Sequence, residues 1–271
     1  MIGKTSRGLF LYLSSTWVVF LSFESYRGPL TLNLHGKTET FASLEIGAEV
    51  QCSAELISFP TIHLKIPFAQ AASWQAPKPA GEPLSSDLLR EGLLSVLRLA
   101  AHGVPDRRLL TLLYEIMSDR PGSELSDPIF YPLLKRLQVA CQEGSLNATA
   151  RSLEAFLGLG PGLTPSGDDL VMGFLLALSR WGRRLSSAEQ VAYYSQHLLP
   201  RAHHLTGHLS ASLIACACRG QADERLIQAL DGLVTGSPEA SHYLAALSTW
   251  GSSSGFDALA GMLIFLMHSQ S

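Results

Sequence analysis

Apolar residues recur with the period of an α-helix through the C-terminal two-thirds of the chain. Two clear stripes are Leu88, Leu89, Leu93, Leu94 and Leu97, and then Leu109, Leu112, Leu113 and Ile116. Glycines and prolines interrupt the pattern at intervals of one helix length, where glycine favours a helix end and proline cannot continue one. The pattern therefore predicts an all-α region of about ten helices.

The N-terminal part has shorter apolar runs that are typical of strands. They occupy residues 9–23, 30–34, 44–50, 52–59 and 62–68. The β-branched and aromatic residues of the first run predict a strand, residues 27–29 a turn, and the alternation of Leu30, Leu32 and Leu34 a second strand. We expect a small antiparallel sheet or barrel in this part of the chain.

The first apolar run also resembles a signal peptide, because Lys4 and Arg7 precede it. That interpretation fails on two counts. Residues 23–26 offer no cleavage site with small residues, and the run is shorter than the roughly 20 residues of a membrane-spanning helix. We expect no membrane association.

A linker separates the two regions. Residues 70–84 contain Pro77, Pro79 and Pro83 among alanine and glycine, a composition that continues neither helix nor strand. The sequence predicts an α+β protein with a small antiparallel β-rich domain over residues 1–70, an exposed linker, and a larger all-α domain over residues 85–271.

Composition narrows the class of protein. A chain of 271 residues with 46% hydrophobic residues has enough apolar surface for a globular core. Its net charge of −3 provides no basic surface for nucleic acid. The four cysteines are scattered, which fits neither a disulfide framework nor paired zinc-binding cysteines. These features favour a protein of the reducing cytoplasm.

Glycine and proline are most concentrated in residues 158–169, GLGPGLTPSGDD, which lie between two apolar helical runs. Several glycines together indicate positive φ angles or close approach of the backbone to another group. A nucleotide-binding P-loop needs Gly-Lys followed by Ser or Thr, and the dinucleotide fingerprint needs a preceding strand. The remaining prediction is an anion site at a helix N-terminus, with a carboxylate beside it that holds a metal or takes a proton.

A second copy of this helix start strengthens the prediction of a site. Residues 166–173 and 254–261 share the pattern Ser-Gly-x-Asp-x-x-x-Gly. Asp169 and Gly173 lie on one helix face, as do Asp257 and Gly261, because each pair is four residues apart. We expect the two helices to cross closely at the glycines and to bring the two aspartates together in a cleft. A leucine at either glycine should destabilise the fold by roughly 1 to 3 kcal/mol, and alanine should be milder.

An ordinary helix start is the alternative explanation of the first copy. In that case Thr164 or Ser166 is the N-cap, Pro165 the first helical residue, and Asp169 the acid of a capping box. This alternative assigns no ligand to the segment.

Three of the nine histidines lie in residues 203–208. His204 and His208 have the i,i+4 spacing of metal ligands, but the glutamate of a zinc protease motif is missing. Thr206 and Ser210 are also four apart, and their hydroxyls either face a substrate or bond to the helix backbone.

Three segments in this order resemble the AllH family. They are GLGPGLTPSGDD at 158–169, Thr206 and Ser210 followed by Ala217 and Gly220, and Ser254, Gly255 and Asp257 followed by Leu259 and Gly261. The named member of this family is a subunit of oxamate carbamoyltransferase. The resemblance implies a role in allantoin and purine nitrogen catabolism, in which oxalurate and phosphate give oxamate and carbamoyl phosphate. It also implies partner subunits, an FdrA-like protein and a further carbamoyltransferase subunit.

These observations give one leading hypothesis. Backbone and hydroxyl groups of Gly160, Gly162, Thr164, Ser166, Gly167, Thr206, Ser210, Ser254 and Gly255 bind a small anion, which is a carboxylate, phosphate or carbamoyl phosphate. Asp169 and Asp257 accept hydrogen bonds from the carbamoyl nitrogen, or act through a Mg²⁺ ion. Asp168 is a weaker candidate, since it lies about 100° around the helix from Asp169. The competing hypothesis is a non-catalytic anion-binding or scaffold subunit.

Overall fold

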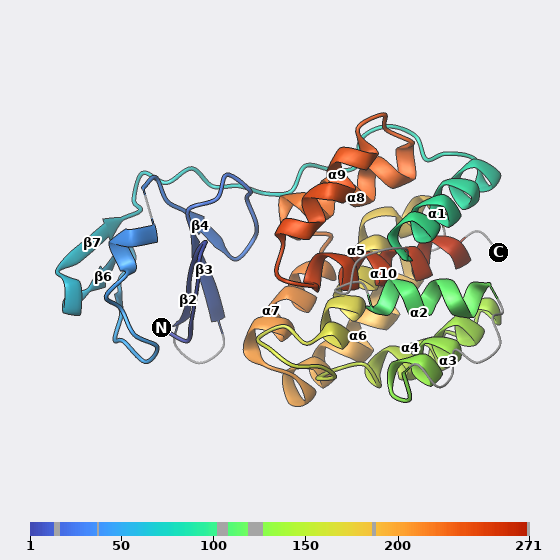
Figure 1. Ribbon diagram of the computed structural model, residues 1–271, viewed down its shortest axis with the longest axis horizontal. Coiled ribbons are helices and arrows are strands. Elements are labelled where there is room, and N and C mark those ends of the chain that lie inside the picture. Colours follow the sequence, from blue (N-terminus) through green and yellow to red (C-terminus); the bar gives the residue numbers. More distant parts are fainter. Residues whose placement is uncertain (14–16, 37, 102–107, 119–126, 186–187, 270–271) are drawn as a thin grey trace. The chain divides into compact units, whose positions relative to one another are not determined.

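The computed structural model describes residues 1–13, 17–36, 38–101, 108–118, 127–185 and 188–269. It divides into two compact units, Met1–Ala76 and Pro77–Ser271, the first built on strands and the second on helices. Figure 1 shows both units. Each is described by itself.

The N-terminal unit contains two small sheets. Their strands are β1 (Gly3–Thr5), β2 (Gly8–Leu13), β3 (Trp17–Ser22) and β4 (Thr31–Asn33), and then β5 (Gln51–Cys52), β6 (Leu56–Phe59) and β7 (Leu64–Pro67). Each sheet follows the order of the chain. All pairs are antiparallel except β3 with β4, in which Phe20 pairs with Thr31 in parallel.

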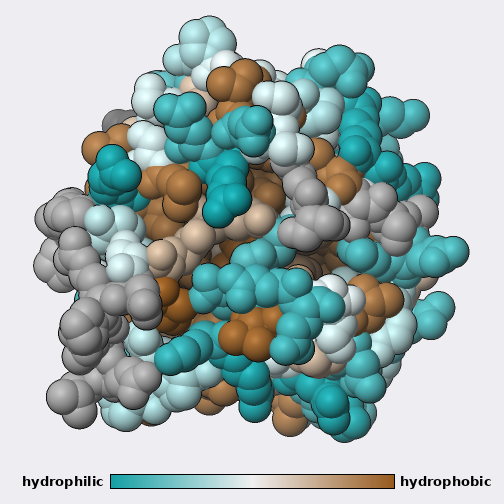
Figure 2. Space-filling view, turned by 90° about the vertical axis from the view of Figure 1, so that its right-hand side faces the viewer, coloured by the Kyte–Doolittle hydropathy of each residue, from teal (hydrophilic) through white to brown (hydrophobic). Residues whose placement is uncertain are grey.

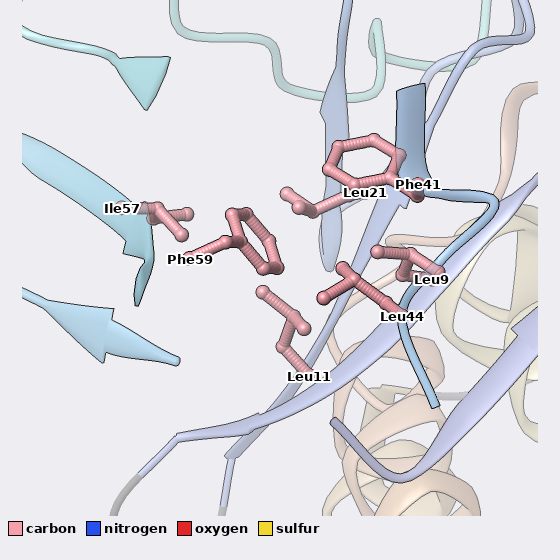
Figure 3. Close-up of a cluster of buried hydrophobic side chains, with 7 residues drawn as sticks. All are labelled: Leu9, Leu11, Leu21, Phe41, Leu44, Ile57 and Phe59. Atoms are coloured by element: carbon pink, nitrogen blue, oxygen red, sulfur yellow. The ribbon is translucent and has the colours of Figure 1, made fainter. Parts of the chain in front are cut away.

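One apolar cluster holds this unit together (Figure 3). It consists of Leu9, Leu11, Leu21, Phe41, Leu44, Ile57 and Phe59. Strands β2 and β3 contribute from the first sheet and β6 from the second, while Phe41 ends the 3₁₀ helix η2 (Thr38–Phe41). The two sheets therefore share one core, as the alternation of inward-facing residues along β2 and β6 requires.

Several details of the predicted sheet were wrong. The run at residues 52–59 is interrupted between β5 and β6, and β3 pairs with β4 in parallel although an antiparallel sheet was expected. The run at residues 9–23 forms two paired strands, β2 and β3, in place of one; residues 14–16 between them lie outside the described part. Residues 44–50 form no strand. A turn closes there with a hydrogen bond of 3.0 Å from the Ala48 amide to the Glu45 carbonyl. Gly47 has φ of 95° inside this turn, which ends an extended backbone.

The C-terminal unit contains ten α-helices within the described residues, so the α+β class with about ten helices is confirmed. They are α1 (Ser86–Ala101), α2 (Arg108–Met117), α3 (Phe130–Gln142), α4 (Leu146–Glu154), α5 (Ser166–Leu185), α6 (Ala188–Leu205), α7 (His208–Ala217), α8 (Glu224–Thr235), α9 (Ala240–Ala246) and α10 (Ser254–His268). Helix α10 runs through the middle of the unit (Figure 1), and its residues 254–266 are all buried.

Helices α5 and α10 approach each other as closely as backbones allow. A Cβ atom built on Gly173 would lie 1.9 Å from the carbonyl oxygen of Ala258. A Cβ atom on Gly261 would lie 1.9 Å from the carbonyl oxygen of Leu170. The predicted close crossing at these two glycines is confirmed. It aligns the starts of the two helices beside each other.

The outer helices follow the predicted apolar stripes with a narrower buried face. In α1, Leu89, Leu93 and Leu97 are buried, whereas Leu88 is 55% and Leu94 36% exposed. Hydrophobic residues, coloured brown, are interspersed with hydrophilic ones on the face in Figure 2, as on an ordinary protein surface. Each helix in the described ranges is too short or too polar to cross a membrane.

Candidate functional site

The loop before α5 has the positive φ angles that its glycines predict. Gly158, Gly160 and Gly162 have φ angles of 78°, 118° and 97°. A Cβ atom on Gly158 would lie 2.4 Å from the carbonyl oxygen of Leu205, and the space around Gly162 is open. Glycine is therefore required at Gly158 both for its φ angle and for close packing, whereas at Gly162 the φ angle alone requires it.

The second position of each motif is a glycine for a different reason. A Cβ atom on Gly167 would lie 2.1 Å from the carbonyl oxygen of Phe156, and one on Gly255 would lie 2.2 Å from that of Leu247. Each helix start is thus pressed against the backbone of the segment before it. The two copies share this packing as well as their sequence.

The two aspartates lie in a reciprocal arrangement. Asp169 and Asp257 are each 2% exposed. The hydroxyl of Ser254, in the second copy, is a hydrogen-bond partner of the Asp169 carboxylate, and Ser166, in the first copy, is a partner of Asp257. Thr164 Oγ1 and Ser254 Oγ are 3.1 Å apart and link the two loops directly. The structure therefore brings the two aspartates together, 88 positions apart in the sequence.

Burial controls the ionisation of this pair. It raises the pKa of Asp257 to about 6, against the lowering effects of Ser253, Ser166 and Arg108. Burial also raises the pKa of Asp169 well above its usual range, and the negative charges of Asp257 and Asp168 raise it further. In each carboxylate the Oδ2 atom is buried with no hydrogen-bond partner among the described residues. Buried oxygens of this kind are costly unless another group satisfies them.

Several backbone amides at the two helix starts are already engaged. The amide of Gly167 donates to the Leu159 carbonyl at 2.9 Å, and that of Gly255 to the Trp250 carbonyl at 3.1 Å. In the described part of the chain, the amides of Gly160, Gly162, Thr164 and Ser166 have no hydrogen-bond partner. The amides that remain for an anion therefore include those of the glycine-rich loop and that of Ser254, in the second motif.

The simple helix-start explanation does not describe the first copy. Helix α5 begins at Ser166, one residue later than a Pro165 start would place it. The carboxylate of Asp169 has Ser254 and Thr164 as its partners, so it closes no capping box with Ser166. Its contact with Ser254 lies across the helix crossing.

Asp168 has a different environment from Asp169. Its Oδ1 accepts a hydrogen bond of 2.7 Å from the Gly158 amide, and its Oδ2 accepts one from the Thr206 hydroxyl. Ser210 also interacts with it, and Ser210 Oγ lies 3.4 Å from the Leu163 carbonyl oxygen. Burial raises the pKa of this carboxyl. Asp168, Thr206 and Ser210 together hold the glycine-rich loop in place.

The histidines do not form a metal site of the kind their spacing suggests. His204 is in the last turn of α6 and His208 is the first residue of α7, so the i,i+4 pair does not lie on one helix. Thr206 and Gly207 separate the two helices. Within the described ranges, no three His, Cys, Asp or Glu side chains are grouped to hold a metal ion.

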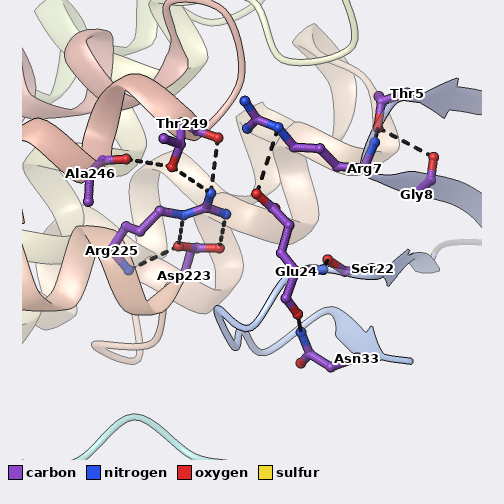
Figure 4. Close-up of polar contacts among 10 residues, drawn as sticks. All are labelled: Thr5, Arg7, Gly8, Ser22, Glu24, Asn33, Asp223, Arg225, Ala246 and Thr249. Carbon is purple, nitrogen blue, oxygen red and sulfur yellow. Dashed lines mark hydrogen bonds and ion pairs between the residues drawn. The ribbon is translucent and has the colours of Figure 1, made fainter. Parts of the chain in front are cut away.

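Two arginines beside the site have no motif that would have identified them. Arg225 is buried and binds both carboxylate oxygens of Asp223, and its Nη1 donates to the carbonyl and hydroxyl of Thr249 at 3.0 Å each (Figure 4). Thr249 ends the 3₁₀ helix η5 (Leu247–Thr249), which leads into the second motif. Arg108 acts on Asp257 from α2.

This arrangement can hold one proton between two buried carboxylates. Two neighbouring carboxylates that both resist ionisation provide one hydrogen-bond donor and one acceptor near neutral pH. The hydroxyls of Thr164, Ser166 and Ser254 surround them. The site is suited to a small group that both donates and accepts hydrogen bonds.

A family model described as oxamate carbamoyltransferase subunit AllH matches residues 156–266. The matched segment contains both Ser-Gly-x-Asp copies, α5 and α10. The resemblance inferred from the motifs is therefore confirmed for this part of the chain. No curated protein and no solved structure matches the chain.

Proposed function

We propose that this chain is a subunit of a carbamoyltransferase, related to oxamate carbamoyltransferase of allantoin catabolism, and that Asp169 and Asp257 contact the carbamoyl group. One observation carries the proposal. The Oδ2 atoms of both buried aspartates have no hydrogen-bond partner among the described residues, although both carboxylates are positioned by the serine of the opposite motif.

A carbamoyl group matches these two oxygens. Its nitrogen carries two N–H donors and its carbonyl oxygen is an acceptor, all in one plane. An ionised Asp257 accepts from the nitrogen, and a neutral Asp169 donates to the oxygen. Both interactions are strong in a buried site, because water does not compete for them.

The same two aspartates can supply the proton that the reaction requires. Transfer from oxalurate to phosphate breaks the bond between the carbamoyl carbon and the amide nitrogen and forms a bond from that carbon to a phosphate oxygen. The leaving nitrogen takes up one proton and the hydrogen phosphate gives one up. Asp169, whose pKa burial raises well above its usual range, is the group that holds a proton for the leaving nitrogen.

Anion binding in this proposal falls to the glycine-rich loop. The amides of Gly160, Gly162, Thr164 and Ser166 lie at the start of α5, where the helix dipole favours negative charge. Alternatively, Asp169 and Asp257 would hold a Mg²⁺ ion, which would supply positive charge to the anion, since carboxylate and hydroxyl oxygens are ligands that this ion accepts. A chelator distinguishes the alternatives, because only the metal-bound form loses oxamate binding in EDTA.

Partner subunits belong to the proposal, because the matched family is named as one subunit of an enzyme. An FdrA-like protein and a further carbamoyltransferase subunit are the partners that the resemblance implies.

We also propose a cytoplasmic location. It is supported by Cys52, Cys141, Cys216 and Cys218, all of which are free thiols.

Ligand-induced stabilisation tests the proposal. The melting temperature of the chain, alone and mixed with its partner subunits, is measured with oxalurate, oxamate, carbamoyl phosphate and phosphate. Binding to the folded state raises this temperature as ligand concentration exceeds the dissociation constant. A rise that Asp169→Asn and Asp257→Asn abolish supports the carbamoyl site. No rise with any ligand favours the alternative, a scaffold subunit whose paired helix starts only pack two helices.

A further inference from the structure

Arg108 is held beside the candidate site with one edge of its guanidinium group occupied. Its Nε is paired with Asp127, a buried carboxylate that also accepts hydrogen bonds of 3.1 and 2.9 Å from the amides of Ile129 and Phe130. The guanidinium carbon lies 5.0 Å from the centre of the Phe130 ring. These contacts fix the plane of the group and its orientation.

The other edge of the guanidinium group is not engaged by the described residues. The Arg108 side chain is 57% exposed, and its two terminal nitrogens have no partner among the described residues. A guanidinium group with a free edge presents two parallel N–H groups, which match the two oxygens of a carboxylate or phosphate.

Arg108 also acts on Asp257, one member of the aspartate pair. It is the first residue of α2, which packs against α10, the helix that carries Asp257. Its positive charge acts on Asp257 and lowers the pKa of that carboxyl against the effect of burial. Arg108 on α2 and Asp257 on α10 thus influence each other from neighbouring helices.

The position of Arg108 relative to Asp257 matters because an ionised carboxylate repels an anion. A ligand with negative charge at both ends would place one charge against Asp257. A ligand with one anionic and one uncharged end avoids this repulsion, since its charged end lies against Arg108 and its neutral end against the carboxylates.

We propose that Arg108 binds the anionic end of a small ligand whose uncharged carbamoyl end lies against the Oδ2 atoms of Asp169 and Asp257. The ligand class is a short carboxylate or phosphate that carries a neutral CO–NH₂ group. This inference rests on the proposed function and assigns Arg108 as a residue that determines specificity.

Three related probes test both ends of the ligand. Oxamate has one carboxylate and one amide, oxalate has two carboxylates, and oxamide has two amides. Binding to the full chain, with its partner subunits, is measured by calorimetry at pH 7.5. We expect oxamate to bind at least about 10-fold more tightly than oxalate, because oxalate brings a second charge to the aspartates.

Variants assign the anionic end to Arg108. Arg108→Gln should weaken oxamate about 10- to 100-fold and leave the weak binding of oxamide unchanged, as expected for loss of a charged hydrogen-bonding pair. Arg108→Lys retains the charge and should lose less oxamate affinity. It also serves as a second test if Arg108→Gln leaves Asp127 unpaired and impairs folding. Arg136→Gln, at an exposed arginine of α3 without a described partner, is the matched control and should bind as the parent does.

The outcomes separate the two proposals. If Arg108→Gln binds oxamate as the parent does while Asp169→Asn and Asp257→Asn do not, the role of Arg108 is wrong and the proposed function stands. If oxalate binds as tightly as oxamate, the neutral end is wrongly assigned. If the parent binds none of the three probes, both proposals fall.

Discussion

Gly173 and Gly261 each contact the backbone of the opposite helix, and the two contacts are equivalent. Gly173 meets Ala258, which follows Asp257, and Gly261 meets Leu170, which follows Asp169. The glycine of one motif therefore fixes the position of the other motif's aspartate. The two copies form one structural unit.

The glycines provide the first prediction. Gly173→Ala and Gly261→Ala should each destabilise the protein, because a methyl group there would lie 1.9 Å from a backbone carbonyl oxygen. Leucine should lower the free energy of unfolding by roughly 1 to 3 kcal/mol or more. Alanine should be milder than leucine, but it still has a cost, because backbone atoms cannot yield as a flexible side chain does. Urea unfolding measures the effect.

Gly92 is the matched control for these variants. It lies inside α1, and a Cβ atom placed on it would have nothing within 4 Å, so Gly92→Ala should stabilise by roughly 0.5 to 1 kcal/mol. Parental stability of both Gly173→Ala and Gly261→Ala would contradict the close crossing.

The aspartate pair provides the second prediction. Asp169→Asn and Asp257→Asn should each weaken oxamate binding roughly 10-fold, and the double variant should lose less than the sum, because residues that share one bound group are not additive. The free energy of unfolding at pH 7 should be unchanged or higher, since burial opposes the ionised form of each carboxyl and an asparagine amide does not ionise.

A purely structural role predicts the opposite pattern for these variants. Loss of a cap lowers stability by a few tenths to about 1 kcal/mol, additively, with oxamate affinity unchanged. Asp87→Asn, in the exposed first turn of α1, is the control for the change in charge. Additive losses of stability with unchanged oxamate binding would contradict the hypothesis that the two aspartates share one site.

The third prediction concerns pH. Burial raises the pKa of Asp257 from 3.8 to about 6. Between about pH 4 and 6 the folded protein holds a proton that the unfolded chain has released, so this group stabilises the fold below about pH 4, and that contribution is lost as the pH rises through 6. The shift corresponds to about 3 kcal/mol.

The difference between parent and variant isolates this effect. Asp127 has a lowered pKa and acts in the opposite direction at low pH, so parental stability alone is ambiguous. The parent should lose stability relative to Asp257→Asn as the pH rises from 4 to 7 in urea unfolding experiments. Parallel pH profiles of the two proteins would show that Asp257 ionises normally.

The fourth prediction concerns the linker. The boundary between the two units lies after Ala76. Residues beyond it are attached to the helical unit, since the Leu84 amide donates to the Val234 carbonyl at 2.8 Å and Arg184 donates to the Gly81 carbonyl at 2.7 Å. Limited proteolysis should therefore cut first at residues 70–76, ahead of 79–84. Cleavage spread through residues 85–150 with none at 70–84 would show that the boundary is misplaced.

The sequence alone determined the features that depend on local spacing. The period of apolar residues predicted the helical region, and the repeated Ser-Gly-x-Asp-x-x-x-Gly pattern predicted the two helix starts and the crossing at Gly173 and Gly261. These follow from the chain itself, because residues four apart on a helix share a face whatever packs against it.

Only the tertiary structure decided how the polar groups pair. The exchange of Ser166 and Ser254 between the two aspartates, the engagement of Asp168 with Thr206, and the position of Arg108 beside Asp257 join residues far apart in the chain. The same holds for the parallel pairing of β3 with β4. A hydrogen bond or charge pair depends on distances between elements, and residue spacing within one element does not specify those distances.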